Sequence, residues 1–411
     1  MKLSITSLCV LLATGLFAQE PLLTQGDNFP DVVIKNISNS PVPSIDLNQA
    51  RDGKYYILNF WGTWCSPCLA EMDSLAKLQK QYKDNIQVIG ISDDSEERKQ
   101  NYLKKKPSTL WLATDTNYLL HQMAQFSSVG QSIIVSPERK IVALVMSDSI
   151  NQKMIDKLLK KETIPSSAEI KKAANTSKDI FGLDSTLAFS FSVRSYMAGR
   201  LSGEQHYLKG AFGGRRFSFF NASIPRMYRT AYNIVSLTQE IYDSSVVEKE
   251  LSDYQNKKTL YNVDLLVEAS QKDSLMSILQ QQLNTYFPIK ARQEKRLLDV
   301  YVLKKIDGYS FNQPASTGKD SLTLISFSGR GFDGTKVTVE QFAQQYLTNE
   351  LSYPVVDETG IKGFYNISTN VELRNKEGIL NSLKAIGLTV EKAKREMPVI
   401  VYYKITHHND N

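Results

Sequence analysis

Apolar and amphipathic stretches alternate along the first 160 residues. The apolar run Tyr55–Trp61 predicts a buried strand, and apolar residues then recur at helical spacing from Leu69 to Tyr82. Further along, the pattern predicts a strand at Ile86–Ile91, a charged helix at Glu96–Lys106, strands at Ser132–Val135 and Lys140–Met146, and an amphipathic helix at Ile150–Lys161. Strands that alternate with helices in this way predict an α/β domain.

The pattern changes after residue 161. Residues 162–185 are polar and rich in Ser, Lys and Ala, which is typical of a linker. Alternating apolar and polar residues resume at Leu187–Arg194 and predict the first strand of another domain. We therefore expect an N-terminal domain over 22–161, a linker over 162–185 and a C-terminal α+β domain over 186–406.

The C-terminal domain contains two similar series, each a strand, a helix, a charged piece and a closing strand. The first series runs through Tyr261–Val263, Leu275–Leu283 and Val300–Lys304, and the second through Tyr365–Ile367, Ile379–Leu383, Glu391–Glu396 and Ile400–Lys404. Chance recurrence of common patterns is the alternative. A true duplication predicts two related strand-helix-strand-strand units that pack as one domain.

Residues 1–18 have the order of a secretory signal peptide. Lys2 precedes the apolar stretch Leu8–Phe17, and Ala18 is a small residue suited to cleavage. The stretch is too short to span a bilayer, and a buried strand or helix is the alternative. Cys9 does not follow a small residue, which disfavours a lipid anchor. With no later segment of transmembrane length, we expect export to the periplasm or cell envelope and a soluble protein after cleavage.

Composition and charge add two limits. The chain has 411 residues, enough for two domains, and 42% of them are apolar, enough for a core in each. The net charge of +6 is small, and its cations are interleaved with acids. We therefore expect no nucleic-acid partner.

Cysteine usage points to chemistry. Of three cysteines, only Cys65 and Cys68 remain after loss of the signal peptide, so no disulfide framework exists. A zinc site needs two more ligands, and the four histidines offer no paired spacing except His407-His408 near the end of the chain. A permanent disulfide at this spacing would be strained and labile. We therefore favour redox chemistry and expect no metal.

The two cysteines stand where a strand ends and a helix begins. Free N–H groups and the positive end of the helix dipole favour the thiolate of the residue at this position, Cys65. Cys68 lies one turn further on and is expected to be more buried, where it can attack a mixed disulfide formed at Cys65. Pro67 is tolerated in the first helical turn, where its missing N–H costs nothing. Ser66 and Pro67 are expected to tune the redox potential.

The segment Phe60–Cys68, FWGTWCSPC, resembles the FW-x-x-WC-x-x-C signature of TlpA/ResA-type thioredoxins. The resemblance covers about residues 22–160 and implies a thioredoxin fold, with a central mixed sheet flanked by helices. It implies Cys65 as the attacking and Cys68 as the resolving cysteine, with no cofactor beyond their disulfide, and an active-site flank of Trp64, Ser66, Pro67 and Gly130. It also implies disulfide-bonded protein clients outside the cytoplasm and a membrane thiol electron donor of the CcdA/DsbD type.

Two positions depart from the general thioredoxin pattern. Asn59 stands where many thioredoxins carry a buried acid, although TlpA-like relatives often have Asn there too, so another group or water must accept the proton. Glu71 is a candidate acceptor, with an exposed helix face as the alternative. Gly130 stands where the family has a cis-proline. Glycine permits unusual backbone angles, and a non-proline cis bond costs about 2.5–4 kcal/mol, so we expect a trans peptide there.

The C-terminal half resembles a family of unknown function found mainly in soil bacteria. The resemblance rests on Gly214–Ser218 with Ala231–Ile234, and on Pro354–Tyr365, which is similar to a VVD-x-TG-x-x-G-x-Y pattern. The polar and glycine positions of that pattern are expected to form a tight turn between two strands. Basic and aromatic residues alternate between Leu187 and Tyr232; they would suit a glycan, an anionic polymer or a protein, but we expect buried aromatics and solvated cations.

Two classes of function follow. The first is a disulfide reductase whose C-terminal domain selects or tethers a client. The second is a redox-responsive binding protein in which the cysteine pair is a switch. The strand-to-helix position of the pair favours catalysis, and the redox potential of the pair would separate a reductase from an oxidase.

Overall fold

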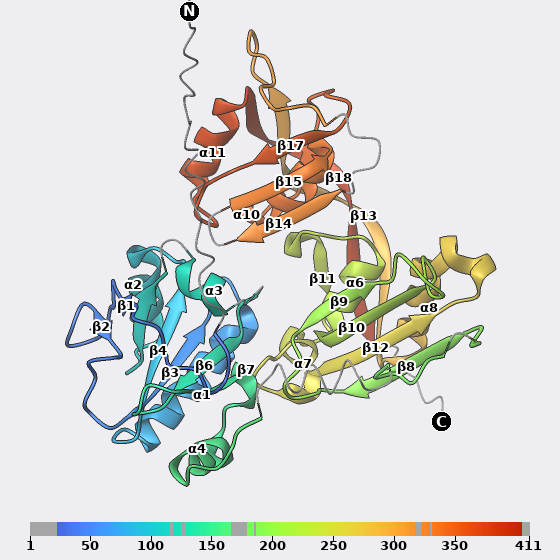
Figure 1. The fold of residues 1–411 in the computed structure, drawn as a ribbon. Coiled ribbons are helices and arrows are strands. Elements are labelled where there is room, and N and C mark those ends of the chain that lie inside the picture. Colours follow the sequence, from blue (N-terminus) through green and yellow to red (C-terminus); the bar gives the residue numbers. More distant parts are fainter. Residues whose placement is uncertain are drawn as a thin grey trace, which may run out of the picture.

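The computed structural model describes residues 23–115, 118–124, 126, 128–165, 179–184, 186–316, 323–328 and 331–404. The expected signal peptide at 1–18, the middle of the expected linker and His407-His408 lie outside the described residues. Figure 1 shows an N-terminal domain, in blue and teal, beside a C-terminal region built as two lobes. No helix among the described residues is both long and apolar enough to cross a membrane.

A five-stranded sheet in the order β5-β4-β3-β6-β7 forms the centre of the N-terminal domain. Its strands are β3 (Tyr55–Phe60), β4 (Ile86–Ser92), β5 (Trp111–Thr114), β6 (Gln131–Val135) and β7 (Ile141–Met146). Strands β3, β4 and β5 are parallel to one another, whereas β6 pairs antiparallel with β3 and β7 pairs antiparallel with β6. This confirms the expected mixed sheet. All residues of β3 and β4 are buried, as in sheets covered on both faces.

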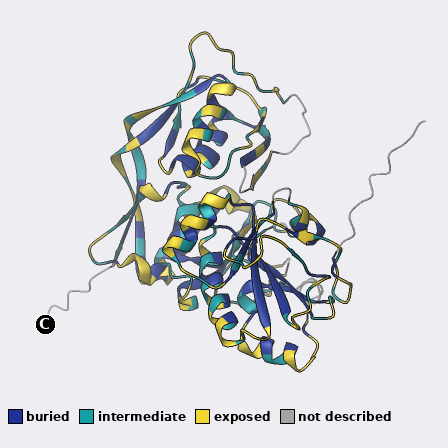
Figure 2. Ribbon diagram, turned by 90° about the vertical axis from the view of Figure 1, so that its left-hand side faces the viewer, coloured by how far each residue is buried: buried dark blue, intermediate teal, exposed yellow. Residues whose placement is uncertain are grey.

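Helices flank this sheet, as Figure 2 shows by its dark buried strands and partly exposed helices. They are α1 (Ser66–Gln81), α2 (Glu96–Lys105), α3 (Leu119–Ala124) and α4 (Gln152–Leu159), with the short strands β1 (Val33–Ile34) and β2 (Ile45–Asp46) and the turn η1 (Ser147–Ser149) alongside. The last helix is shorter than predicted because the Asn151 side chain caps it, accepting a bond from the Met154 N–H.

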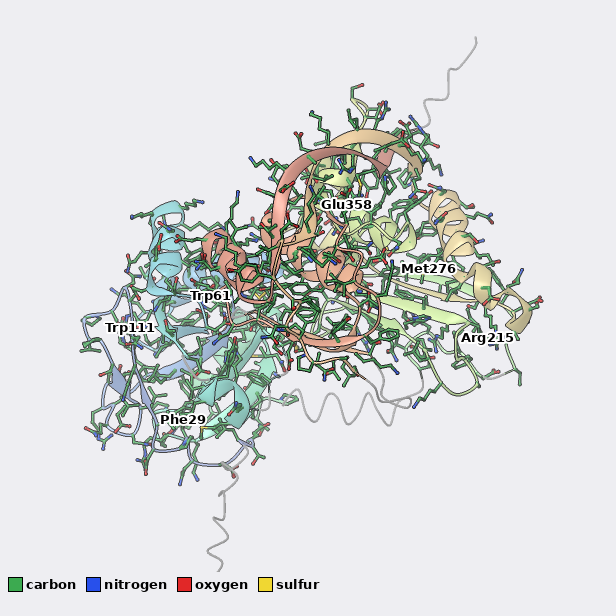
Figure 3. All side chains as sticks on the ribbon, turned by 90° about the horizontal axis from the view of Figure 1, so that it is seen from above. Phe29, Trp61, Trp111, Arg215, Met276 and Glu358 are labelled. Atoms are coloured by element: carbon green, nitrogen blue, oxygen red, sulfur yellow. A yellow bond between two sulfur atoms is a disulfide. The ribbon has the colours of Figure 1, made fainter. Side chains whose placement is uncertain are left out.

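Two apolar clusters pack on the sheet of the N-terminal domain. In one of them Trp61 is fully buried and its ring lies 4.8 Å from that of Tyr102. Gly90 in β4 leaves the space for this indole, because a Cβ there would lie 2.6 Å from Trp61 Nε1. Figure 3 labels Trp61 in this domain.

The first lobe contains a four-stranded sheet in the order β8-β12-β10-β9. Its strands are β8 (Ser190–Ser195), β9 (Gly203–His206), β10 (Arg216–Ser223) and β12 (Leu260–Leu266). The helices and short elements are α6 (Ile224–Ala231), η2 (Leu237–Gln239), β11 (Glu240–Tyr242), α7 (Glu248–Leu251), η3 (Lys257–Thr259), η4 (Ala269–Ser274) and α8 (Leu275–Tyr286).

The second lobe has a three-stranded sheet in the order β14-β15-β17. Its elements are β14 (Leu324–Ser328), β15 (Gly331–Val337), α9 (Val339–Gln341), the π-helical turn η5 (Phe342–Leu347), α10 (Thr348–Leu351), β16 (Val355–Asp357), β17 (Tyr365–Ser368) and α11 (Lys376–Ala385). Between β16 and β17, Asp357 Oδ1 accepts bonds from the N–H and hydroxyl of Thr359, and Gly360 and Gly363 have positive φ. This confirms the predicted tight turn.

Two long antiparallel strands join the lobes. Strands β13 (Ile289–Lys305) and β18 (Leu388–Lys404) pair along their whole length. Strand β11 adds in parallel to β18 in the first lobe, and β16 adds in parallel to β13 in the second. Each lobe thus repeats the order strand, helix, short parallel strand, strand, helix, long strand, and each has its own apolar core.

The predicted unit of strand, helix, strand and strand is wrong in one respect. The charged piece and the closing strand of each series belong to a single strand of 17 residues. Its middle lies between the two lobes, where side chains are largely exposed, so no apolar alternation marks it as a strand.

For the basic and aromatic segment 187–232, the expectation of buried aromatic and solvated basic side chains is only partly confirmed. Phe217, Phe219 and Tyr228 are buried in the core of the first lobe, which confirms their structural role. Arg216, by contrast, is not solvated, because its side chain is only 1% exposed and pairs with Asp179 and Asp264. The sequence pattern could not show this, because one partner lies 37 residues earlier and the other 48 residues later.

Candidate functional site

The cysteine pair lies at the start of α1, immediately after the turn that follows β3. Cys65 and Cys68 form a disulfide with their Cα atoms 5.2 Å apart. Cys68 is 1% exposed and packs in the core, whereas Cys65 is partly exposed. One sulfur of the disulfide thus belongs to a partly exposed residue and the other to a residue enclosed by the core.

The local backbone favours negative charge on the outer sulfur. Cys65 is the N-cap of α1, and its Sγ accepts the N–H of Cys68 at 3.3 Å. Pro67 occupies the first turn, where no intrahelical N–H bond is lost. The free N–H groups and the helix dipole both act on this sulfur, so the reduced Cys65 is expected to be a stabilised thiolate.

The turn before the cysteines is held from the β4–α2 connection. The carboxylate of Asp94 accepts the Thr63 N–H at 2.7 Å and the Thr63 hydroxyl at 3.0 Å. Burial raises the pKa of Asp94 despite these bonds. Trp64 folds over Gly62, since a Cβ on that glycine would lie 2.5 Å from the indole Nε1.

Gly130 precedes β6 and lines the same cleft as the disulfide. Its φ is +86°, its N–H donates to the Phe60 carbonyl at 2.8 Å, and its carbonyl accepts the Ser147 N–H at 3.0 Å. The described residues contain no cis peptide bond, so the expected trans peptide is confirmed. The left-handed backbone is one that glycine adopts at little cost.

Asn59 has a structural place. It is fully buried, and its Oδ1 accepts the hydroxyls of Ser132 at 3.0 Å and Ser147 at 2.5 Å. Its Nδ2 lies 3.1 Å from the sulfur of Met72. These bonds join β3, β6, η1 and α1 behind the active site, and they leave proton transfer to another group.

Glu71 is a buried carboxyl group in the same cleft as the cysteines. It lies three residues after Cys68 on α1, hence on the same helix face, and both line the cleft. Its Oε2 is buried and has no hydrogen-bond partner. Burial, reinforced by the charge of Asp148 and opposed by Lys257, raises the pKa of Glu71 to about 7. The alternative of an exposed helix face is wrong for this residue.

This raised pKa predicts a pH-dependent effect of Glu71→Gln on stability. Because the pKa of the folded state lies near 7 and the ordinary value is 4.5, the stabilising contribution is complete below pH 4.5 and is lost as pH rises through 7. The variant is therefore expected to have a higher Tm than the wild type at pH 8 and a nearly equal Tm at pH 4.5. Thermal unfolding across this range checks it, with the exposed Glu97→Gln as control; an equal offset at both pH values would contradict it.

The first lobe forms the opposite wall of the cleft. A cavity of about 490 Å³ is lined on one side by the cysteine motif, Glu71 and the loop at Gly130, and on the other by residues of 196–202, 221–226 and 254–260. The Tyr196 hydroxyl donates to Asp148, and Gln255 Nε2 donates to Asp73 at 2.9 Å. The disulfide therefore faces a cleft between two domains instead of open solvent.

The second lobe contacts the N-terminal domain on the other side of the motif. Glu372 accepts the Ser95 N–H at 2.7 Å, and Arg98 donates to the Leu373 carbonyl. Arg98 also pairs with Asp94, which anchors Thr63. The second lobe thus contacts the residues that hold Thr63 in the turn before the cysteines, and the first lobe lines the cleft that the cysteines face.

Sequence reasoning found the motif and its flank but missed this wall. Its members Tyr196 and Arg200 stand in the basic and aromatic segment, which was a usable signal, while Tyr254 and Lys257 carry none. Asp94 and Asp148 are acids that follow strands and belong to no motif, and only the fold shows that they meet Thr63 and Tyr196.

The fold and the site define a class: the N-terminal domain is a thioredoxin-like thiol–disulfide oxidoreductase domain. Residues 25–143 match the AhpC/TSA family, and residues 245–405 match a protein family of unknown function, DUF3738. More particularly, the domain resembles thiol–disulfide oxidoreductases of the TlpA/ResA type, and a region that matches DUF3738 follows it in the same chain.

Several individual proteins are similar to the N-terminal part of this chain. The thioredoxin-like protein YneN of Bacillus subtilis is 35% identical over 82 residues, 20% of this chain and 46% of YneN, so the chain spans a little under half of that protein. The thiol–disulfide oxidoreductase ResA of the same organism is 26% identical over 32% of this chain and 72% of ResA. The solved thioredoxin domain of a thiol–disulfide oxidoreductase from Bacteroides vulgatus is 24% identical over 34% of this chain and 99% of that chain, with a TM-score of 0.28.

Proposed function

We propose that the whole protein is an extracytoplasmic reductase of protein disulfides, and that its C-terminal region selects the client. The observation that carries the proposal is the position of Cys65: at a helix N-terminus, bonded to an N–H, partly exposed, and joined to a buried partner. A nucleophile and a resolving thiol need this arrangement, whereas a structural disulfide does not.

The proposed cycle has two exchange steps. The Cys65 thiolate of the reduced protein attacks one sulfur of a client disulfide, forms a mixed disulfide and releases the other client sulfur as a thiolate. The Cys68 thiol then loses its proton, for which Glu71 in the same cleft is the candidate acceptor, and attacks Cys65 Sγ. This step releases the second client thiolate and leaves the Cys65–Cys68 disulfide. Two electrons pass from the dithiol to the client in each cycle.

The oxidised pair must then be reduced by another dithiol. We propose a membrane thiol carrier of the CcdA/DsbD type for this step, since the N-terminal sequence has the order of an export signal and export would separate the protein from cytoplasmic reductants. Location, donor and client selection are parts of this one proposal, and each is open to a separate test.

Reduced full-length protein, freed of reductant, provides the test. Mixed with excess disulfide-linked peptide, it is expected to release two peptide thiols per protein and to end with Cys65 joined to Cys68. Equilibration with glutathione is expected to give a potential well below that of the glutathione couple. Absence of any peptide reduction would refute the reductase and leave the redox switch.

A further inference from the structure

We propose that the cleft between the N-terminal domain and the first lobe binds a disulfide that carries a carboxylate beside its cysteine. In this proposal Arg200 and Lys257 of the first lobe bind the carboxylate while Cys65 attacks the sulfur. The inference rests on the proposed reductase function and specifies the chemical class of its substrate.

The shape of the cleft limits what reaches the cysteine. Its volume of about 490 Å³ lies in the range of small-molecule sites, and its two walls come from different domains. Leu201 Cδ2 lies 3.8 Å from the position that a Cβ on Gly130 would occupy, so the first lobe closes against the loop beside the disulfide. Such a space accepts a small disulfide or a few residues of extended chain.

Arg200 is fixed in place and has no acidic partner in the part of the chain that the structure describes. Its guanidinium carbon lies 4.5 Å from the centre of the Phe220 ring, and its carbonyl accepts the Asn221 side chain at 2.7 Å. No carboxylate of the described residues lies within ion-pair distance of this guanidinium. A planar cation held on an aromatic face and left unpaired is suited to a carboxylate ligand.

Lys257 adds a second cation to the same wall. Its Nζ lies 5.0 Å from the centre of the Tyr196 ring and forms no ion pair with a described carboxylate. The third cation of the cleft, Arg226, is already paired with Glu204 at 2.9 Å. Two lysine or arginine side chains are therefore available to a ligand.

The acids of the cleft offset these cations only in part. Asp148 accepts the Tyr196 hydroxyl, and Glu71 is buried beside it with an unpartnered oxygen. Because burial raises the pKa of Glu71 to about 7, this carboxyl carries only part of a negative charge at neutral pH. The wall that faces the disulfide from the first lobe thus has an excess of positive charge.

Two disulfide-linked peptides of one sequence test the proposal, one with Glu and one with Gln on both sides of the cysteine. Reduced full-length protein is mixed with each, the reaction is stopped with acid, and the second-order rate constants are compared. At low salt the acidic peptide is expected to react faster by about tenfold or more, the effect of one hydrogen bond to a charged group. Arg200→Gln and Lys257→Gln are each expected to reduce this ratio to below about threefold, mainly because the acidic peptide reacts more slowly.

Arg194→Gln is the matched control, because Arg194 is exposed on β8 of the same lobe and does not line the cleft. The intrinsic reactivities of the two peptides cancel when their ratio is compared between variants. A peptide ratio that is raised in the wild type but that neither variant changes would overturn the proposal. A ratio near one in the wild type would overturn it if the pair of glutathione disulfide and its ethyl ester also shows no preference. Reaction with neither peptide would remove the reductase function and this inference together.

Glutathione disulfide and its ethyl ester form a second arm that identifies the source of the carboxylate. A preference for the acid over the ester that Arg200→Gln abolishes would assign the site to a low-mass thiol compound. A preference seen only with the peptide pair would assign it to acidic side chains of a client protein. Each result supports the site, and loss of preference in both arms contradicts it.

Discussion

Replacing Cys68 with serine is expected to stop the reaction halfway and to leave the client covalently attached to Cys65. The serine hydroxyl cannot attack the mixed disulfide, so the intermediate accumulates. Cys65→Ala removes the attacking sulfur, and turnover is expected to fall to background, by about a thousandfold or more. Non-reducing mass spectrometry of full-length protein incubated with a disulfide-linked peptide measures both outcomes.

The two variants serve as controls for each other. The expected adduct forms with Cys68→Ser, not with Cys65→Ala, and disappears with dithiothreitol. An adduct on Cys68 in the Cys65→Ala protein would mean that the buried sulfur is reached first. That result would contradict the assignment of roles based on a 1% exposed Cys68 and a partly exposed Cys65.

Replacing Arg216 with methionine is expected to cause the largest loss of stability. The guanidinium bonds Asp264 at 2.9 Å and both carboxylate oxygens of Asp179, and it lies 4.4 Å from the centre of the Tyr207 ring. Removing it leaves the fully buried Asp264 without its countercharge. A loss of about 3–5 kcal/mol in the free energy of unfolding is expected for one partner of a buried ion pair.

Urea unfolding of the full chain measures this loss. Arg194→Met, an exposed change in the same lobe, is expected to stay within about 0.5 kcal/mol of the wild type. The double variant Arg216→Met with Asp264→Leu is expected to recover part of the loss, because it no longer buries an unpaired charge. A single variant as stable as the control would show that the pair contributes no net stability.

The contacts of the C-terminal region bear on how the active site is held. Asp94 positions Thr63 just before the motif, and the neighbouring residues Ser95 and Arg98 are bonded to Glu372 and Leu373 of the second lobe. The first lobe holds Asp148 through Tyr196. The C-terminal region therefore contacts both flanks of the motif as well as the mouth of the cleft.

The sequence was most informative where function depends on neighbours in the chain. The strand, the turn and the helix around Cys65 and Cys68 follow from residues within one short segment, and the structure has them as predicted. The basic and aromatic segment marked Tyr196 and Arg200, but their position opposite the cysteines, with that of Lys257, could not be predicted, because the packing of two domains creates it. The sequence pattern also predicted each of the long strands β13 and β18 as two separate pieces, because the exposed middle of each strand has no apolar alternation.

The central claim is that the first turn of α1 stabilises the thiolate at position 65. The most direct test is the rate of iodoacetamide alkylation of the reduced full-length protein as a function of pH, with Cys68→Ser used to isolate the outer thiol. The claim predicts a midpoint clearly below the value of about 8.5 for free cysteine. A midpoint at or above that value, or a thiol that is not alkylated in the folded protein, would contradict it.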